Sequence, residues 1–252
     1  MDALIIAAGF GSRLRAISEC KPLTPVLGIP LLAVGVRQAA AADVERVVVV
    51  TGHQADQVEA ALPRLARAAH IEVVAHRVED WSRPNGYSVM AGASQIEGDY
   101  LLMMADHIFS ASILSALVKQ GRADRGVTLA VDRRVDNALV DPDDATWVDI
   151  DDGGFIRAIG KDLAHYNAVD CGAFLATHEL ASAIGIAIAN GRPGSLSDGM
   201  QHLAGIGRAA TMDVGNAWWI DVDDPQSHAL AEAEAAFRLA DIYGAPGSWA
   251  AA

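Results

Sequence analysis

The first half of the chain alternates short, continuously apolar runs with longer segments of helical periodicity. Because polar residues do not interrupt the apolar runs, the strands they predict are buried on both faces, as in a mostly parallel sheet. Intervening helices then cover both faces, which defines an α/β fold with a doubly wound sheet. The predicted strands are 3–8, 47–51, 71–75, 100–105 and 127–131, and the predicted helices are 31–42, 54–68, 86–96 and 110–120.

The pattern changes between residues 146 and 177. A turn at 151–154 separates the runs 146–150 and 155–159, which predicts a β-hairpin, and a further strand follows near 169–176. We expect this hairpin to be a small antiparallel insertion that covers one side of the site. The remaining predictions are helices near 178–190 and 195–206, a strand pair near 209–222 and a helix from Pro225 to about Tyr243, while the alanine-rich tail after Gly244 carries no functional signal.

Length, charge and cysteine content narrow the class of protein. A chain of 252 residues with 52% hydrophobic content can bury a full core, so we expect a single domain. A formal charge of −13 argues against a nucleic-acid or anionic-membrane partner. The two cysteines have no metal-ligand spacing, Asp2 stands where a signal peptide would be basic, and no apolar run approaches the ~20 residues of a membrane span. These features predict a soluble, cytoplasmic protein. The sequence does not specify an oligomeric state, and a homodimer is compatible with it.

The first strand runs into a glycine loop that is suited to phosphate binding. Gly9 and Gly11 let the backbone turn tightly and bring its N–H groups close to an anion, while Arg13 and Lys21 supply positive charge. Pro22 follows Lys21, so the loop is not a P-loop, which requires Ser or Thr there. A dinucleotide fingerprint requires a third small residue and an acid roughly 20 residues further on, and neither is found. The loop therefore predicts nucleotide chemistry of another kind.

Asp106 closes the apolar run 100–105. In a parallel sheet it would lie at the edge where ligands bind, ready to hold a divalent ion that bridges phosphates. The alternative is that Asp106 caps the helix that starts near Ser110. His107 follows directly and is a candidate for supporting Asp106.

A second acidic group closes the run that begins at Trp218. Strand alternation places Asp221 and Asp223 on one face, so they are the preferred partners of Asp106 at a metal site. Asp224 before Pro225 is more simply explained as a helix N-cap with proline at the first helical position. Oxygen ligands and substrate phosphates favour Mg²⁺ over a softer metal.

Two further loops reach the same edge of the predicted sheet. Arg83 to Ser88 forms a turn followed by a helix, where Asn85 and the Gly86 backbone are candidates for reading a base. Thr51 ends the second strand, and both base contact and a simple capped loop remain open for it.

Lysine is scarce in this chain, and Lys161 stands in a loop after the predicted hairpin. It is a candidate for binding a second phosphate. Asp162 and Asp170 could then accept hydrogen bonds from the hydroxyls of a polyol.

The glycine loop with Arg13, the segment Lys21-Pro22-Leu23 and Asp106 at a strand end together resemble the nucleotidyltransferase superfamily, which joins sugar or alcohol phosphates to nucleotides. More specifically, five motifs in order resemble CTP:inositol-1-phosphate cytidylyltransferases. These motifs are Asn85-Gly86-Tyr87-Ser88, Ala105-Asp106-His107-Ile108-Phe109, Gly160-Lys161-Asp162-Leu163, Val169-Asp170-Cys171-Gly172 and Trp219-Ile220-Asp221-Val222-Asp223.

The resemblance implies a Rossmann-like nucleotidyltransferase fold of GT-A-like type, with a nucleotide-binding half (1–130) and an acceptor-binding half (131–252). It implies that myo-inositol 1-phosphate attacks the α-phosphorus of CTP in line, giving CDP-inositol and pyrophosphate without a covalent intermediate. For the nucleotide, the resemblance implies that Ala7, Ala8, Gly9 and Gly11 enclose it, that Arg13 and Lys21 neutralise the triphosphate and that Asn85 and Gly86 contact cytosine. For the metal, it implies that Asp106 with Asp221 or Asp223 holds Mg²⁺. For the acceptor, it implies that Lys161 binds the inositol phosphate and that Asp170 contacts the ring hydroxyls.

This chain departs from the family pattern at Ala105, where Gly is more usual, and at Cys171, where Thr is expected. Many relatives continue into a membrane-embedded transferase domain, and this chain ends at Ala252, so we expect it to make the activated alcohol and pass it on. The alternatives are a sugar-1-phosphate nucleotidyltransferase that uses UTP or dTTP, a cytidylyltransferase for phosphocholine, whose positive charge suits Lys161 poorly, and a nucleotide-binding regulatory subunit.

Overall fold

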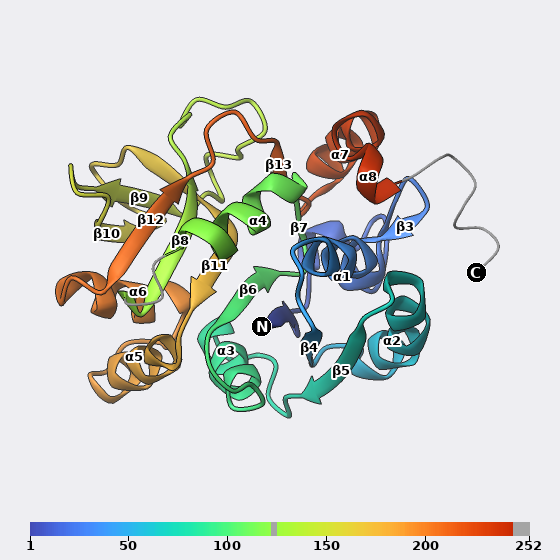
Figure 1. The fold of residues 1–252 in the computed structure, drawn as a ribbon, viewed down its shortest axis with the longest axis horizontal. Helices are drawn as coiled ribbons and strands as arrows, with labels where there is room; N and C mark the ends of the chain where they lie inside the picture. Colours follow the sequence, from blue (N-terminus) through green and yellow to red (C-terminus); the bar gives the residue numbers. More distant parts are fainter. Residues whose placement is uncertain (122–124, 244–252) are drawn as a thin grey trace.

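A computed structural model describes residues 1–121 and 125–243, and within this part of the chain the main feature is a nine-stranded mixed sheet (Figure 1). Its order is β10-β9-β11-β6-β1-β4-β5, with β8 also paired to β11 and β12 paired to β8. The strands are β1 (Asp2–Ala7), β4 (Arg46–Thr51), β5 (Glu72–Arg77), β6 (Tyr100–Met104), β8 (Val127–Asp132), β9 (Trp147–Ile150), β10 (Ile156–Gly160), β11 (Ala168–Ala176) and β12 (Ala209–Asp213).

Helices and short two-stranded sheets complete the described fold. The helices are α1 (Leu31–Ala41), α2 (Ala55–Ala69), α3 (Asn85–Ala93), α4 (Ala111–Gln120), α5 (His178–Ala189), α6 (Leu196–Gly205), α7 (Pro225–Arg238) and α8 (Ala240–Tyr243), with single 3₁₀ turns at Ser12–Leu14 and Lys21–Leu23. The short sheets pair β2 (Pro25–Val26) with β3 (Ile29–Pro30) and β7 (His107–Phe109) with β13 (Trp219–Asp221).

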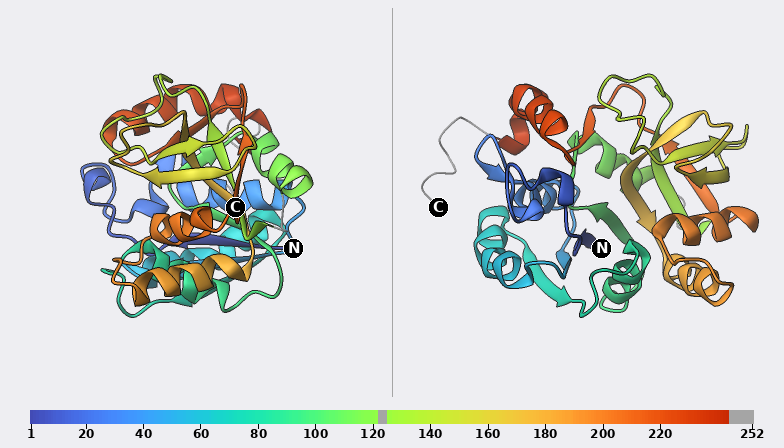
Figure 2. Two further views of the ribbon diagram at one scale, coloured as in Figure 1. Left: turned by 90° about the vertical axis from the view of Figure 1, so that its left-hand side faces the viewer. Right: turned by 180° about the vertical axis from the view of Figure 1, so that it is seen from behind.

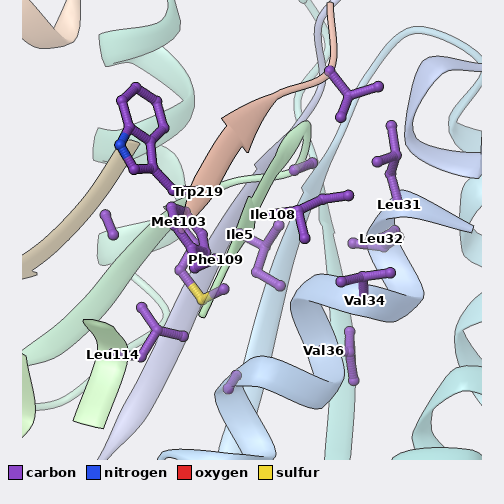
Figure 3. Close-up of a cluster of buried hydrophobic side chains, with 14 of the residues drawn as sticks. Ile5, Leu31, Leu32, Val34, Val36, Met103, Ile108, Phe109, Leu114 and Trp219 are labelled. Atoms are coloured by element: carbon purple, nitrogen blue, oxygen red, sulfur yellow. The ribbon is translucent and has the colours of Figure 1, made fainter. Parts of the chain in front are cut away.

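The parallel strands are buried on both faces, as their unbroken apolar sequences require. On one face Ile5 and Met103 pack with α1 and α4 (Figure 3). Val49 and the apolar residues of α2 belong to the same buried cluster. On the other face Leu4 and Leu102 pack with α3, α5 and α6. Successive residues of β1 therefore serve opposite cores, which confirms the expected doubly wound α/β fold.

The predicted hairpin forms as β9 and β10 and lies at the opposite end of the molecule from α1 and α2 (Figure 2). The hairpin joins the main sheet where β9 pairs antiparallel with β11, and β11 also pairs antiparallel with β6 and β8. The register of β11 against β8 shifts between Asp170 and Phe174. Gly172 lies within this irregular stretch and has a φ of +76°.

Three predictions about elements need correction. The strand pair expected near 209–222 is wrong, since β12 pairs in parallel with β8 and β13 pairs antiparallel with β7. β7 itself covers residues for which no strand was expected. The expected helix from Pro225 to Tyr243 is divided at Leu239 into α7 and α8.

Nothing in the described ranges is a helix both long and apolar enough to cross a membrane. The alanine-rich tail after Gly244 lies outside the described residues.

Candidate active site

Two cavities meet beyond the carboxyl ends of β1 and β6. The first, about 280 Å³, is bordered by the loop after β1 and is here called the glycine-loop cavity. The second, about 260 Å³, is bordered by β11, β13 and the β8–β9 loop and is here called the β11 cavity. Both are lined by Arg13, Asn85, Met104, Asp106 and Asp223.

The glycine loop lines the first cavity with its backbone. Ala7, Ala8, Gly9 and Gly11 all border it, as expected from the sequence. Gly11 has a φ of +62°, and a Cβ there would lie 2.5 Å from Cβ of Lys21. A side chain at Gly11 would therefore both strain the loop and displace Lys21.

Lys21 and Arg13 form a cationic pair at the junction of the cavities. The side chain of Lys21 is only 10% exposed, and its Nζ donates to Oδ2 of Asp106 over 2.6 Å. Lys21 also pairs with Asp223, and Arg13 pairs with both Asp223 and Asp144. Each cation is thus held by carboxylates, and the structure brings Lys21 into contact with Asp106 and both cations into contact with Asp223.

Asp106 lies between β6 and β7 and does not cap α4, which begins after Ser110. Its Oδ1 accepts a hydrogen bond from Nδ1 of His107 over 2.8 Å. Burial tends to raise the pKa of Asp106, but Lys21 and His107 hold that pKa well below its usual range. Burial also tends to lower the pKa of His107, but Asp221, Asp106 and Asp170 raise it to about 9. At neutral pH the pair is therefore a carboxylate beside an imidazolium.

The antiparallel pairing of β7 with β13 brings Asp221 opposite His107. Oδ1 of Asp221 lies 3.7 Å from Nδ1 of His107 and forms no hydrogen bond with any described residue, although it is buried. Burial raises the pKa of Asp221, while His107 opposes the rise. An orphaned carboxylate oxygen among further acids is suited to a cation.

Among the described residues, two groups have possible ligand atoms that all lie within 4.8 Å of one another inside the group, and Asp221 belongs to both. One group adds Asp106 and His107, of which His107 has no free lone pair while it is protonated, and the other adds Asp144 and Asp223. The donors are mainly carboxylate oxygens, so they fit a hard divalent cation.

The β11 cavity collects the residues expected to meet an acceptor. Asp170 lines it, and Oδ1 of Asp170 accepts the Gly172 N–H over 2.7 Å. Burial raises the pKa of Asp170 to about 6, and this hydrogen bond limits the rise. Lys161 lines the same cavity, with its Nζ 2.5 Å from Oδ1 of Asp144.

Asn85 lines both cavities at the start of α3, and its Oδ1 accepts the Leu196 N–H over 2.8 Å. Three other expected site residues line neither cavity. Thr51 is the last residue of β4. It is fully buried, and its hydroxyl donates to Glu59 of α2 over 2.6 Å. A Cβ at Gly86 would lie 2.3 Å from the Gly194 carbonyl, so this glycine permits close packing of α3 and does not offer its backbone to the cavity. Asp162 is exposed after β10.

Several cavity residues were missed by sequence reasoning. Asp144 stands in an acidic, proline-containing loop without recognisable spacing. Trp81 and Arg83 line the glycine-loop cavity just before the segment that contains Asn85. Trp219 lines the β11 cavity, and its Nε1 donates to the buried Asp132 over 2.9 Å. For Trp81 and Trp219 the available signal was an aromatic residue close to or within a suspected motif, whereas Asp144 had no such signal.

Fold and site together define a nucleotidyltransferase. Residues 3–182 match the MobA-like NTP transferase domain, and the chain belongs to this family. It is 34% identical over 233 residues to a bifunctional IPC transferase and DIPP synthase of Rubrobacter xylanophilus, covering 92% of this chain and 51% of that protein. A protein of the same name from Aquifex aeolicus is 27% identical, and the match covers 89% of this chain and 49% of that protein. The chain thus spans about half the length of these curated relatives.

Solved structures show the same fold. The inositol-1-phosphate CTP transferase from T. maritima superposes with a TM-score of 0.81 at 22% identity, covering 97% of this chain and 96% of that one. A UDP-glucose pyrophosphorylase complexed with UDP-glucose gives a TM-score of 0.74 at 18% identity, covering 92% and 97%.

Proposed function

We propose that the chain transfers a cytidylyl group from CTP to myo-inositol 1-phosphate, giving CDP-inositol and pyrophosphate. The carrying observation is that two cavities with cationic side chains share one wall at Asp106. A triphosphate in one and a phosphate in the other would meet there. The choice of an inositol phosphate as acceptor follows the name of one fold neighbour, the inositol-1-phosphate CTP transferase from T. maritima.

In this proposal the glycine-loop cavity takes CTP. Backbone N–H groups near Gly9 and Gly11, together with Arg13 and Lys21, neutralise the triphosphate, and Asn85 contacts the base. Phosphoryl transfer depends on positioning and on charge neutralisation, so a protein nucleophile is not required.

The β11 cavity takes the acceptor. Lys161 pairs with the inositol phosphate, and Asp170 accepts hydrogen bonds from ring hydroxyls. A phosphate oxygen of the acceptor then forms a bond to the α-phosphorus while the bond from this phosphorus to the bridging oxygen breaks, and pyrophosphate leaves.

Asp106 and Asp221, with Asp223, would hold Mg²⁺. When bound, the ion neutralises charge that develops on the phosphates. Lys21 and His107 hold Asp106 ionised, which keeps it ready for a cation. We place the reaction in the cytoplasm, where the two buried free cysteines stay reduced.

A pyrophosphate-release assay tests the proposal across CTP, UTP, dTTP and ATP with inositol 1-phosphate, glucose 1-phosphate and phosphocholine as acceptors. We expect turnover with CTP and inositol 1-phosphate. Turnover only with UTP or dTTP and the hexose phosphate would refute the substrate assignment. No turnover with any pair, from folded protein with Mg²⁺, would refute the activity itself.

The acceptor site has its own test in Lys161→Ala. Removing a half-exposed charge should raise the KM for inositol 1-phosphate by about 3- to 10-fold, with the KM for CTP little changed. Lys119→Ala, on the exposed face of α4, is the matched control. Equal losses for both substrates would contradict the assignment of Lys161.

A further inference from the structure

One acidic side chain connects the cations of the two cavities. Asp144, in the loop between β8 and β9, has its Oδ2 2.5 Å from Nη2 of Arg13 and its Oδ1 2.5 Å from Nζ of Lys161. Arg13 lines both cavities, whereas Lys161 lines the β11 cavity. In the free protein a single carboxylate therefore pairs with two cations that are assigned above to different phosphates, and Arg13 has Asp223 as a second partner.

The side chain of Asp144 is less exposed than that of either partner. Its side chain is 22% exposed, compared with 43% for Arg13 and 57% for Lys161. Burial tends to raise the pKa of Asp144, but Lys161 and Arg13 hold it below its usual value. The carboxylate is thus ionised at neutral pH.

The loop that carries Asp144 is held by other groups. The Ala145 N–H donates to the Asp141 carbonyl over 2.9 Å, and the Asp143 N–H donates to Oδ1 of Asp141 over 3.0 Å. The Asp170 N–H donates to the Thr146 carbonyl over 2.9 Å, which ties the loop to β11. None of these bonds uses the Asp144 side chain, so its contacts with the two cations are not needed to shape the loop.

We propose that Asp144 is an internal counter-ion that competes with phosphate for Arg13 and Lys161. This inference rests on the proposed function, because it takes both cations to be phosphate ligands. An entering phosphate that takes over the donors now paired with Asp144 has to displace this carboxylate from Arg13 and Lys161.

Removing a polar side chain from a binding cavity usually weakens binding. If Asp144 competes with phosphate, Asp144→Asn should bind phosphates more tightly than the native protein. Partly exposed ion pairs are weak, so we expect about a 2- to 5-fold decrease in Kd. If Asp144 instead serves only to hold substrate hydroxyls or a metal, the same variant should leave the Kd of metal-free phosphates unchanged.

Isothermal titration calorimetry with inorganic tripolyphosphate and with inorganic phosphate tests this, in EDTA so that loss of a metal ligand does not contribute. Asp143→Asn is the matched control, since it removes the same charge from an exposed position of the same loop that lines neither cavity. Thermal melts verify that each variant is folded, and Asp144→Ser is the second variant if the amide does not fold.

We expect tighter binding of tripolyphosphate and phosphate by the Asp144 variants and a change within about 1.5-fold for the control. Equal tightening in Asp143→Asn, an unchanged Kd in the Asp144 variants or weaker binding by them would each overturn the inference. The proposed function fails separately, if native protein with Mg²⁺ neither binds CTP nor releases pyrophosphate.

Discussion

Gly172 links the backbone of β11 to the carboxylate site, and Gly172→Ala tests that link. Gly172 has a φ of +76°, and a Cβ built there lies 2.4 Å from Cδ2 and 2.7 Å from Nε2 of His107. His107 in turn donates to Asp106 over 2.8 Å. A methyl group at Gly172 therefore strains the backbone and pushes the imidazole that supports Asp106.

The magnitude follows from two costs. A non-glycine residue in the left-handed region costs about 1–2 kcal/mol. Overpacking a buried contact costs about 1–3 kcal/mol, because neither the β11 backbone nor the His107 ring is a flexible chain end. Together they lower the free energy of unfolding by about 2–5 kcal/mol, which for a chain of this size lowers Tm by roughly 5–15 °C.

Gly215→Ala is the matched control. Gly215 also has a positive φ, +59°, but a Cβ there meets no heavy atom within 4 Å. It should lose only the backbone cost of about 1–2 kcal/mol.

Thermal melts of both variants in EDTA give the comparison, and pyrophosphate release at 25 °C, where both are folded, gives the effect on catalysis. We expect the larger Tm loss and a reduced kcat only in Gly172→Ala. Equal Tm losses in the two variants would refute the steric argument, and an unchanged kcat in Gly172→Ala would refute the link through His107 to Asp106.

Three further predictions concern charged groups. Lys21→Ala removes a buried donor from the phosphate site and should lower kcat by about 100- to 1,000-fold in the pyrophosphate assay, whereas Lys119→Ala should not; similar rates for both variants would contradict the role of Lys21. Asp221→Asn should raise the Mg²⁺ concentration for half-maximal activity by about tenfold or more, and an unchanged Mg²⁺ titration would exclude Asp221 as a ligand. Burial raises the pKa of Asp170 from 3.8 to about 6, so the folded protein binds more protons than the unfolded chain between these values. As the pH rises from about 4 to about 6, the free energy of unfolding of the native protein should therefore fall relative to that of Asp170→Asn. Urea denaturation in EDTA measures both, and a difference that does not depend on pH would contradict the raised pKa.

Much of the sheet is predictable because local sequence and burial agree there. The apolar run of β1 can only be buried on both faces, and its two neighbours in the sheet, β4 and β6, have the same character. The capping of α7 by Asp224 is likewise local, since Asp224 and Ser227 bond to each other's backbone within one turn. The split at Leu239 depends on packing and could not be read from periodicity.

Site residues on adjoining loops follow the same division. The positions of Lys21 and Asp106 were foreseeable from strand ends and residue type. Sequence alone could not exclude Thr51 from the nucleotide site, because the role of Thr51 depends on which side chain its hydroxyl contacts. That side chain is Glu59 in the following helix, α2. Asp144 was missed because the β8–β9 loop has no periodicity to indicate which of its acids turns inward.

From local sequence it follows that the glycine loop, Arg13 and Lys21 come after a buried strand and that Asp106 comes after another, since chain order and strand burial are local properties. Which acids join them depends on long-range packing. The β7–β13 pairing brings Asp221 against His107, and the β8–β9 loop brings Asp144 between Arg13 and Lys161. These contacts join segments far apart in sequence, and their formation depends on the packing and pairing of whole elements, which no local pattern encodes.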